Sequence, residues 1–83
     1  MAAPNPIEEA QAKTRLQLIE AAGEIFAEAG FRAATVRAIC ERAGANIASV
    51  NYHFGDKGKL YLEVLRFTQK QAAEKYPTDL GVK

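Results

Sequence analysis

Apolar residues recur at intervals of three and four between residues 14 and 29, and charged residues occupy the positions between them. The apolar positions are Leu18, Ala22, Ile25, Phe26 and Ala29. This spacing predicts a helix with one buried face. The opposite, water-facing positions are Glu20, Glu24 and Glu28. The tetrapeptide "TRLQ" has the form of a capping box, so we expect the helix to begin at Thr14. Gly30 is expected to end it, with Phe31 folding back on the last turn.

Two short helical patterns follow, separated by a turn of three residues. Thr35 is the expected N-cap of the first, and its buried face is expected to comprise Val36, Ile39, Cys40 and Ala43. Gly44 ends this helix, and Asn46 caps the next one, which runs to about His53. Two short helices joined by a glycine-containing turn predict a helix-turn-helix. Helices of two turns are too short to be stable alone, so both must pack on the longer first helix.

Asp56 is the expected N-cap of a fourth helix that runs to about Lys75, because Pro77 makes continuation unfavourable. Its apolar face is expected to comprise Leu60, Tyr61, Val64, Leu65 and Thr68. The chain shows no strand-type alternation. The predicted fold is therefore all-α: a three-helix bundle with a homeodomain-like helix-turn-helix, followed by the start of a connecting helix.

The expected division of the chain has four parts. Residues 1–12 form a flexible N-terminal arm, because they contain two prolines and no apolar periodicity. Residues 13–56 form the helix-turn-helix domain, residues 57–76 the connecting helix, and residues 77–83 a frayed tail. With 83 residues the chain is long enough for one small domain.

Composition removes several classes of function. One cysteine and one histidine exclude a disulfide framework within the chain and a zinc cluster, and we expect neither a metal nor a cofactor. No apolar run approaches the roughly 20 residues that span a membrane, and the N-terminus lacks the basic region of a signal peptide. We therefore expect a soluble, cytoplasmic protein.

The net charge of +1 hides an asymmetry along the chain. Residues 1–31 carry two basic and five acidic residues, whereas residues 32–59 carry five basic and two acidic residues. The positive charge thus falls on the predicted helix-turn-helix, where it would steer a polyanion toward that segment.

In a helix-turn-helix the second short helix enters the major groove of DNA, and its first residues contact base edges. Val50 and Phe54, four residues apart, are expected to face the core. The remaining DNA-facing candidates in and around this helix are Asn46, Ile47, Ala48, Ser49, Asn51, Tyr52 and His53. Further candidates outside it are Thr35, Arg37 and Lys57.

Each candidate has a chemical role and a structural alternative. Ile47 could contact a thymine methyl, Ala48 lets the backbone approach, and the polar groups of Ser49 and Asn51 could bond bases or phosphates. Phosphate contacts are expected from Thr35, Tyr52, His53 and Lys57. The structural alternatives are as follows for each residue type. The isoleucine and the tyrosine could simply pack against neighbouring residues, and the histidine could be favoured at a helix C-terminus by the helix dipole. The lysine and the arginine could be solvated surface charges, and the threonine and Asn46 could serve only as helix caps.

The segment "LIEAAGEIFAEAGFRAATVRAICERAGANIASVNYHFGDKGKL" resembles the N-terminal DNA-binding region of the TetR family of bacterial transcriptional repressors. The resemblance covers about residues 14–65. It rests on the Ala-Ala-x-x-x-Phe helix with Gly-Phe, the Thr-Val start of the second helix, the Arg-Ala-Gly end of that helix, and "YHF" followed by the lysine at 57 and the leucine at 60.

The resemblance implies a sequence-specific, non-enzymatic regulator that binds a palindromic double-stranded operator as a homodimer and is released by a small-molecule inducer. In the family, the phosphate contacts fall on Thr35, Tyr52, His53 and Lys57, and the base contacts fall between Asn46 and Asn51. Because the chain ends soon after the fourth helix, we interpret it as an isolated head or fragment, which should dimerise weakly. The sequence also departs from the family: "ANIA" replaces the commoner Val-Ser-x-Gly, and an asparagine at 51 replaces a tyrosine.

Two other classes of function remain as hypotheses. A small enzyme would use His53 as a base with Cys40 or Ser49 as nucleophile, although no orienting carboxylate is evident. A helical interaction module would bind another protein through the apolar stripe of the fourth helix.

Overall fold

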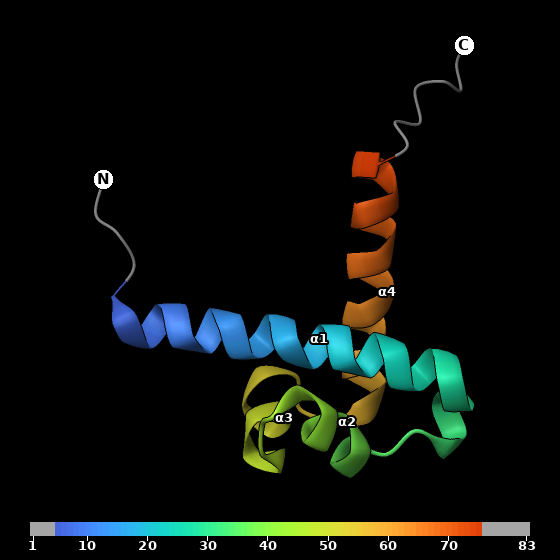
Figure 1. Ribbon diagram of the computed structural model, residues 1–83, viewed down its shortest axis with the longest axis horizontal. Coiled ribbons are helices and arrows are strands. Elements are labelled where there is room, and N and C mark those ends of the chain that lie inside the picture. Colours follow the sequence, from blue (N-terminus) through green and yellow to red (C-terminus); the bar gives the residue numbers. More distant parts are fainter. Residues whose placement is uncertain (1–4, 76–83) are drawn as a thin grey trace.

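The computed structural model describes residues 5–75, which form four helices and no strand. These are α1 (Pro6–Ala33), α2 (Val36–Ala43), α3 (Ile47–His53) and α4 (Lys57–Lys75). Figure 1 shows α2 and α3 together on one side of α1, while α4 crosses the C-terminal half of α1 and projects from its other side. The all-α prediction is confirmed, and the predicted tail lies outside the described residues.

Helix α1 begins earlier than predicted. Asn5 is its N-cap, with a side-chain oxygen that accepts a hydrogen bond from the backbone N–H of Glu8 at 2.8 Å. Pro6 occupies the first helical position, where its missing N–H costs nothing, and acidic side chains in the first turn favour the positive end of the helix dipole. The expectation of a flexible arm was wrong for residues 6–12, and Thr14 lies inside the helix rather than at its cap.

The end of α1 contains a break at Gly30, whose φ of 84° lies in the region that favours glycine. This break turns the last residues so that the Phe31 ring stacks on Phe26 at 5.7 Å and meets Tyr61 of α4 at 5.1 Å between ring centroids. The predicted fold-back of Phe31 is therefore confirmed. Ala29, by contrast, is exposed and does not belong to the buried stripe.

Side-chain caps start the other three helices as predicted. The Thr35 hydroxyl accepts from the N–H of Ala38 at 3.0 Å, and the Asn46 side chain accepts from Ser49 at 3.0 Å. In the same way, the Asp56 carboxylate accepts from the N–H of Lys59 at 2.8 Å. Each cap satisfies a backbone donor that the first turn of a helix leaves without a partner.

Gly44 ends α2 in the left-handed conformation, with φ of 73°. Its N–H donates to the Glu41 carbonyl at 3.3 Å, and the N–H of Ala45 donates to the Cys40 carbonyl at 2.9 Å. This pair of bonds is a Schellman motif, which reverses the chain within the short turn before α3. The predicted three-residue turn is confirmed.

One apolar core joins all four helices. Its buried residues are Leu18, Ile19, Ala21, Ala22, Ile25, Phe26, Ala34, Ile39, Cys40, Val50, Phe54, Leu60 and Val64. The predicted core positions of α2 and α4 are only partly confirmed: Val36, Ala43 and Tyr61 pack at the edge, while Leu65 and Thr68 are exposed. The buried apolar face of α4 is shorter than predicted because only the first half of this helix lies against α1 (Figure 1).

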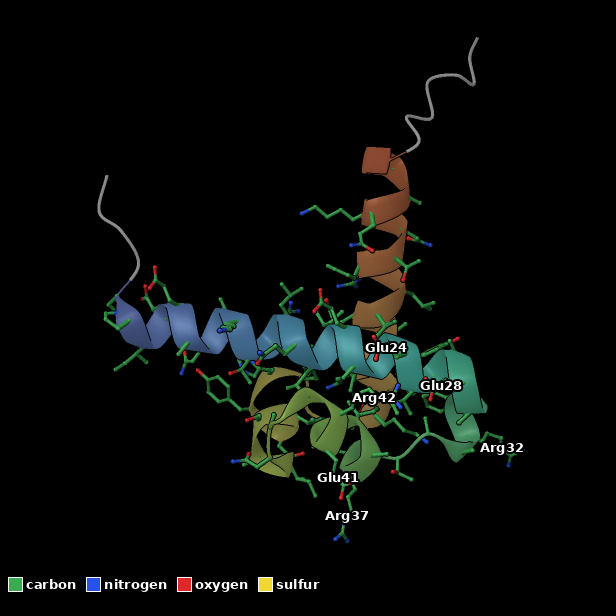
Figure 2. The ribbon with its side chains drawn as sticks, viewed as in Figure 1. Glu24, Glu28, Arg32, Arg37, Glu41 and Arg42 are labelled. Carbon is green, nitrogen blue, oxygen red and sulfur yellow. The ribbon has the colours of Figure 1, made fainter. Side chains whose placement is uncertain are left out.

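Ion pairs also connect the helices around this core. Arg42 of α2 donates to Glu28 of α1 through two nitrogens, at 2.8 and 3.2 Å, and to Glu24 at 3.3 Å (Figure 2). The hydrogen bond from Arg42 lowers the pKa of the Glu28 carboxyl below its ordinary value of 4.5. Because these groups lie at the surface, the ion pairs contribute little to the stability of the fold.

In the part of the chain that the structure describes, no helix combines the length and apolar character that a membrane crossing requires.

Alanine substitution at Gly44 and at Gly58 should change the free energy of unfolding in opposite directions. Gly44→Ala should lower the free energy of unfolding by about 1–2 kcal/mol, because an alanine side chain is strained in the left-handed conformation. Gly58→Ala should raise it by up to about 1 kcal/mol, because Gly58 lies in the first turn of α4 and its added Cβ would meet Asp56 Oδ1 at an acceptable 3.4 Å. Urea unfolding followed by circular dichroism measures both changes. Changes of equal sign would contradict the assigned backbone conformations.

Candidate nucleic-acid interface

Helix α3 has one buried side and one open side. Val50 is fully buried and Phe54, just after the helix, is 7% exposed, as the sequence predicted. On the open side Ile47 is 51% exposed and Tyr52 is 70% exposed. The other exposed candidates of this segment are Asn46, Ala48 and Asn51, and Ser49 and His53 are partly buried. The predicted candidates around α3 are thus exposed or partly exposed, whereas Val50 and Phe54 face the core.

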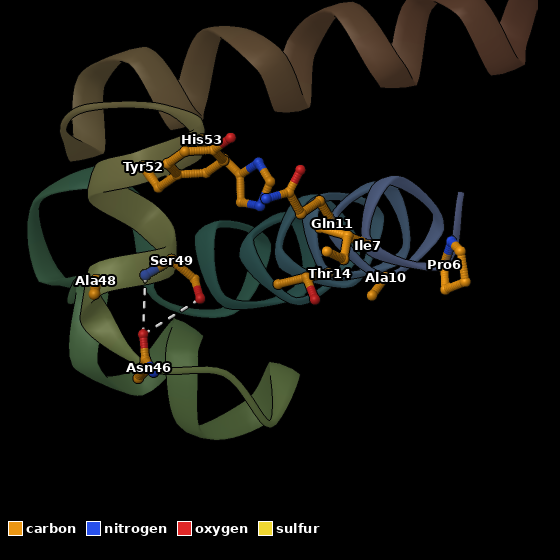
Figure 3. A pocket seen from close by; sticks show the side chains of 10 residues that line it. All are labelled: Pro6, Ile7, Ala10, Gln11, Thr14, Asn46, Ala48, Ser49, Tyr52 and His53. Carbon is orange, nitrogen blue, oxygen red and sulfur yellow. Dashed lines mark hydrogen bonds between the residues drawn. The ribbon is translucent and has the colours of Figure 1, made fainter. Parts of the chain in front are cut away.

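The first turn of α3 is held by a small polar network. The Asn46 side-chain oxygen accepts from both the backbone N–H and the hydroxyl of Ser49, the latter at 3.3 Å (Figure 3). The hydroxyl proton of Ser49 therefore points toward Asn46, which leaves the lone pairs of its oxygen to accept from a ligand. Asn46 acts first as a cap, and its amide nitrogen stays available as a donor.

The end of α3 is aromatic. The rings of Tyr52 and His53 meet edge to face at 4.9 Å, and the Arg15 guanidinium of α1 lies 5.1 Å from the centroid of the Phe54 ring. Burial, and then the positive charge of Arg15, lower the pKa of His53 below its ordinary value of 6.5. The imidazole is therefore neutral at neutral pH and offers one N–H donor.

Two further candidates lie at α2. The Thr35 hydroxyl is exposed and already accepts the capping bond from Ala38, so its proton remains free to donate. Arg37, in the first turn of this helix, makes only a 3.5 Å ion pair with Glu41, and both of these side chains are more than two-thirds exposed. This arginine can leave its partner at little cost, since such exposed pairs contribute little to stability.

Lys57 has a structural role that the sequence did not predict. Its ammonium donates to the backbone carbonyls of Phe31 at 2.7 Å and of Ala34 at 3.0 Å, and it lies 4.4 Å from the Phe31 ring centroid. A third carbonyl, of Arg32, is at 3.5 Å. The lysine therefore binds the carbonyl groups that the end of α1 leaves without a partner. A phosphate contact by Lys57 would require the ammonium to leave them.

A groove runs between the first turns of α1 and the open side of α3. It has a volume of about 560 Å³. Its described lining residues are Pro6, Ile7, Ala10, Gln11 and Thr14 from α1, with Asn46, Ala48, Ser49, Tyr52 and His53 from the α3 segment (Figure 3). Sequence reasoning missed the α1 wall, because it treated residues 1–12 as an arm.

Arg15 is the other residue of the site that sequence reasoning missed. It reaches Glu63 of α4 at 3.0 Å while it lies over Phe54, so one side chain connects α4 to the end of α3. The two partners of the ion pair are 48 positions apart, and no local pattern marks them. Only the crossing of α1 and α4 brings them together.

The geometry gives little support to nucleophilic chemistry. Cys40 is 3% exposed, and burial raises the pKa of its thiol, which is the reverse of what an activated cysteine requires. Among residues 5–75 no group of three or more metal-binding side chains is present. The polar groups of α3 are instead spread along an open helix surface.

Helices α2 and α3 are short and are joined by a tight turn, and α3 is buried on one side and open on the other. This arrangement defines a helix-turn-helix protein. Comparison with known families places it more narrowly. The family of bacterial regulatory proteins called tetR matches residues 18–64, more than half of the chain. The chain belongs to the tetR family.

Similar curated proteins carry names of the same kind. The chain is 39% identical over 61 residues to the HTH-type transcriptional repressor AcnR of Corynebacterium efficiens, which covers 74% of this chain and 32% of that protein. It is 38% identical over 65 residues to the repressor KstR2 of Rhodococcus jostii, with 76% and 32% covered. It is 34% identical over 63 residues to the regulator UidR of Escherichia coli K12, with the same coverage. The chain thus spans about a third of the length of these relatives.

The position of Lys57 predicts a loss of stability when its ammonium is removed. Lys57→Met keeps the aliphatic stem but leaves the carbonyls of Phe31 and Ala34 without their donor, which should lower the free energy of unfolding by about 1–3 kcal/mol. Lys59→Met is the matched control, because Lys59 is exposed in the same turn of α4 and should change stability by less than about 0.5 kcal/mol. If the two variants lower the free energy of unfolding by the same amount in urea, the contacts of Lys57 with the carbonyls do not stabilise the fold.

The lowered pKa of His53 predicts a pH dependence of stability. The unfolded chain takes up this proton at a higher pH than the folded chain, so the free energy of unfolding should fall as pH is lowered from about 7.5 to about 5.5. His53→Gln should flatten the profile in this range. Glu28 does not interfere, because its pKa lies below 4.5. An unchanged slope in the variant would rule out His53 as its source.

Proposed function

We propose that this chain is the DNA-binding head of a transcriptional repressor that occupies an operator and blocks polymerase. The observation that carries this proposal is the two-sided character of α3: Val50 is fully buried, whereas Tyr52, two positions later and on the opposite side of the helix, is 70% exposed. The buried residue fixes the orientation of the helix on α1, and the open side can then enter a major groove. The names of two of the relatives support repression over activation.

The proposed roles follow from position on the surface. The side chains from Asn46 to Asn51 other than the buried Val50 face base edges, with Ile47 against a thymine methyl and Ser49 as an acceptor. Backbone contacts come from Thr35 and Arg37 at the start of α2 and from Tyr52 and His53 at the end of α3. A contribution from Lys57 is proposed as the weakest of these, because its ammonium is engaged by carbonyls.

In a longer protein, helices α1 to α3 would form the DNA-binding domain and α4 would be the connector to a further domain. We propose that this further domain binds a small-molecule inducer and forms a homodimer. Two heads would then meet the half-sites of a palindromic operator about 34–36 Å apart in the bacterial cytoplasm. A single head should bind one half-site, and more weakly, because it lacks the effective concentration of a linked partner.

A second candidate function is a protein-interaction module. The observation in its favour is that Leu62 and Leu65 of α4 are 53% and 41% exposed. A connector that continues into another domain would show the same feature. Pull-down of a specific protein by the chain, combined with an absence of DNA selectivity, would favour this candidate.

Selection from a random duplex pool, followed by anisotropy titration at two salt concentrations, tests the proposal. We expect enrichment of one half-site sequence and an affinity that falls steeply with salt. Two heads fused to a dimerising coiled coil should enrich a palindrome. Failure of the fused heads to select any sequence would contradict the proposed function.

The role of Ile47 can be tested on the selected half-site by replacing each thymine in turn with uracil, which lacks only the methyl group. At one position the wild-type chain should lose about fourfold in affinity, equivalent to about 0.8 kcal/mol for one buried methyl. The Ile47→Ala variant should show no further loss at that position. A loss that persists in the variant would assign the methyl contact to another residue.

The same titrations show whether Lys57 contacts a phosphate or binds only the carbonyls at the end of α1. Each lost phosphate contact should reduce the slope of log K against log salt by about 0.9. Lys57→Met and Lys59→Met should share the wild-type slope if Lys57 acts only on the carbonyls of α1. A smaller slope for Lys57→Met alone would restore it to the set of phosphate contacts.

A further inference from the structure

We propose that the groove between α1 and α3 seats the sugar–phosphate backbone of one DNA strand, so that the first two turns of α1 are part of the DNA interface. This inference rests on the proposed function. It adds a wall of the interface, residues 6–14, that precedes the segment 18–64 matched by the family.

The argument begins with dimensions. An α-helix with its side chains is about 10–12 Å across, and the major groove of B-DNA is about 12 Å wide. A helix that enters the groove therefore fills it and has one phosphate backbone close on each side. On the α1 side of α3 the available space is the groove of about 560 Å³, whose other wall is the first turns of α1. The strand on that side would then run through this groove.

The surface of α1 in the groove suits a backbone strand. Ile7, 69% exposed, and Ala10 offer apolar contact for a deoxyribose, while the Gln11 amide and the Thr14 hydroxyl can donate to phosphate oxygens (Figure 3). From the opposite wall Tyr52 and His53 offer further donors. A folded α1 holds these groups in place, whereas a flexible arm would have to be ordered on binding.

The distribution of charge on α1 agrees with this occupant. Among the described residues that line the groove there is no carboxylate. The acidic residues of the first turn, Glu8 and Glu9, lie outside the lining set, although they alternate with it along the sequence. The helix therefore keeps its negative charge away from the side that would meet phosphates, and the groove side is polar but uncharged.

A charge placed at Gln11 tests the inference. Gln11→Lys should raise the magnitude of the log K against log salt slope by about 0.9 and strengthen binding to all duplexes several-fold, because a lysine there would meet a phosphate. Gln11→Glu should weaken binding to all duplexes without changing base preference. Gln11 is exposed on a helix, so circular dichroism should show an unchanged fold for both variants.

Gln17 supplies the matched control. It is exposed on the same helix, but it lies beside Glu20 and Arg42 in a depression between α1 and α2. Gln17→Lys makes the same change of net charge and should leave the slope near the wild-type value. If the two lysine variants steepen the slope equally, the effect is one of net charge and the inference is wrong.

The remaining outcomes separate this inference from the proposed function. If the wild-type chain binds DNA selectively and Gln11→Lys has the wild-type slope, the proposed function stands and the inference is overturned. If neither the chain nor its coiled-coil fusion binds DNA with a salt dependence, both are overturned. A steeper slope for Gln11→Lys alone establishes the α1 wall of the interface.

Discussion

The position of α3 depends on the burial of Val50 and Phe54 in the core that it shares with α1 and α2. A helix of seven residues has too few hydrogen bonds to offset the cost of its own nucleation, so α3 exists only where tertiary contacts hold it. These two residues supply that contact, together with Leu18 and Ile39 of the neighbouring helices, which are fully buried. The long α1 is therefore the platform on which a short helix can be presented with its opposite side open.

Polar contacts join the helices around this core. Arg42 connects α2 to α1, and Arg15 connects α4 to α1 while it lies over the ring that ends α3. Lys57 joins the first turn of α4 to the carbonyls that precede α2. The contacts of Arg15 and Lys57 join segments that lie far apart in sequence. Together they make the orientation of α3 depend on where α4 lies.

The parts of the fold that depend on local chemistry were predicted from the sequence. The caps Thr35, Asn46 and Asp56 and the left-handed Gly44 each act within four residues, so their signals lie beside the turns they form. The inward positions of α3 followed from a spacing of four. The start of α1 was missed although its signals were present: the prolines were interpreted as loop residues, whereas Pro6 after Asn5 is a proline at the first position of a helix.

The parts that were not predicted depend on the path of the chain in space. No pattern near Lys57 indicates that the carbonyls of residues 31 and 34 lie beside it, and the partner of Arg15 is 48 positions away. The α1 wall of the groove was missed for the same reason, because it requires α1 to extend alongside α3. The candidate residues in α3 follow from helical spacing, whereas their surroundings follow only from the tertiary fold.

The burial of Cys40 has a practical consequence. It is the one thiol of the chain, it lies in the core beside Ile39, and its raised pKa keeps it protonated. A thiol-reactive reagent can therefore reach it only when the core opens, and the labelling rate, compared with that of the unfolded chain, gives the free energy of opening. Because no residue has to be changed, the unmodified chain reports on its own stability, with DNA present or absent.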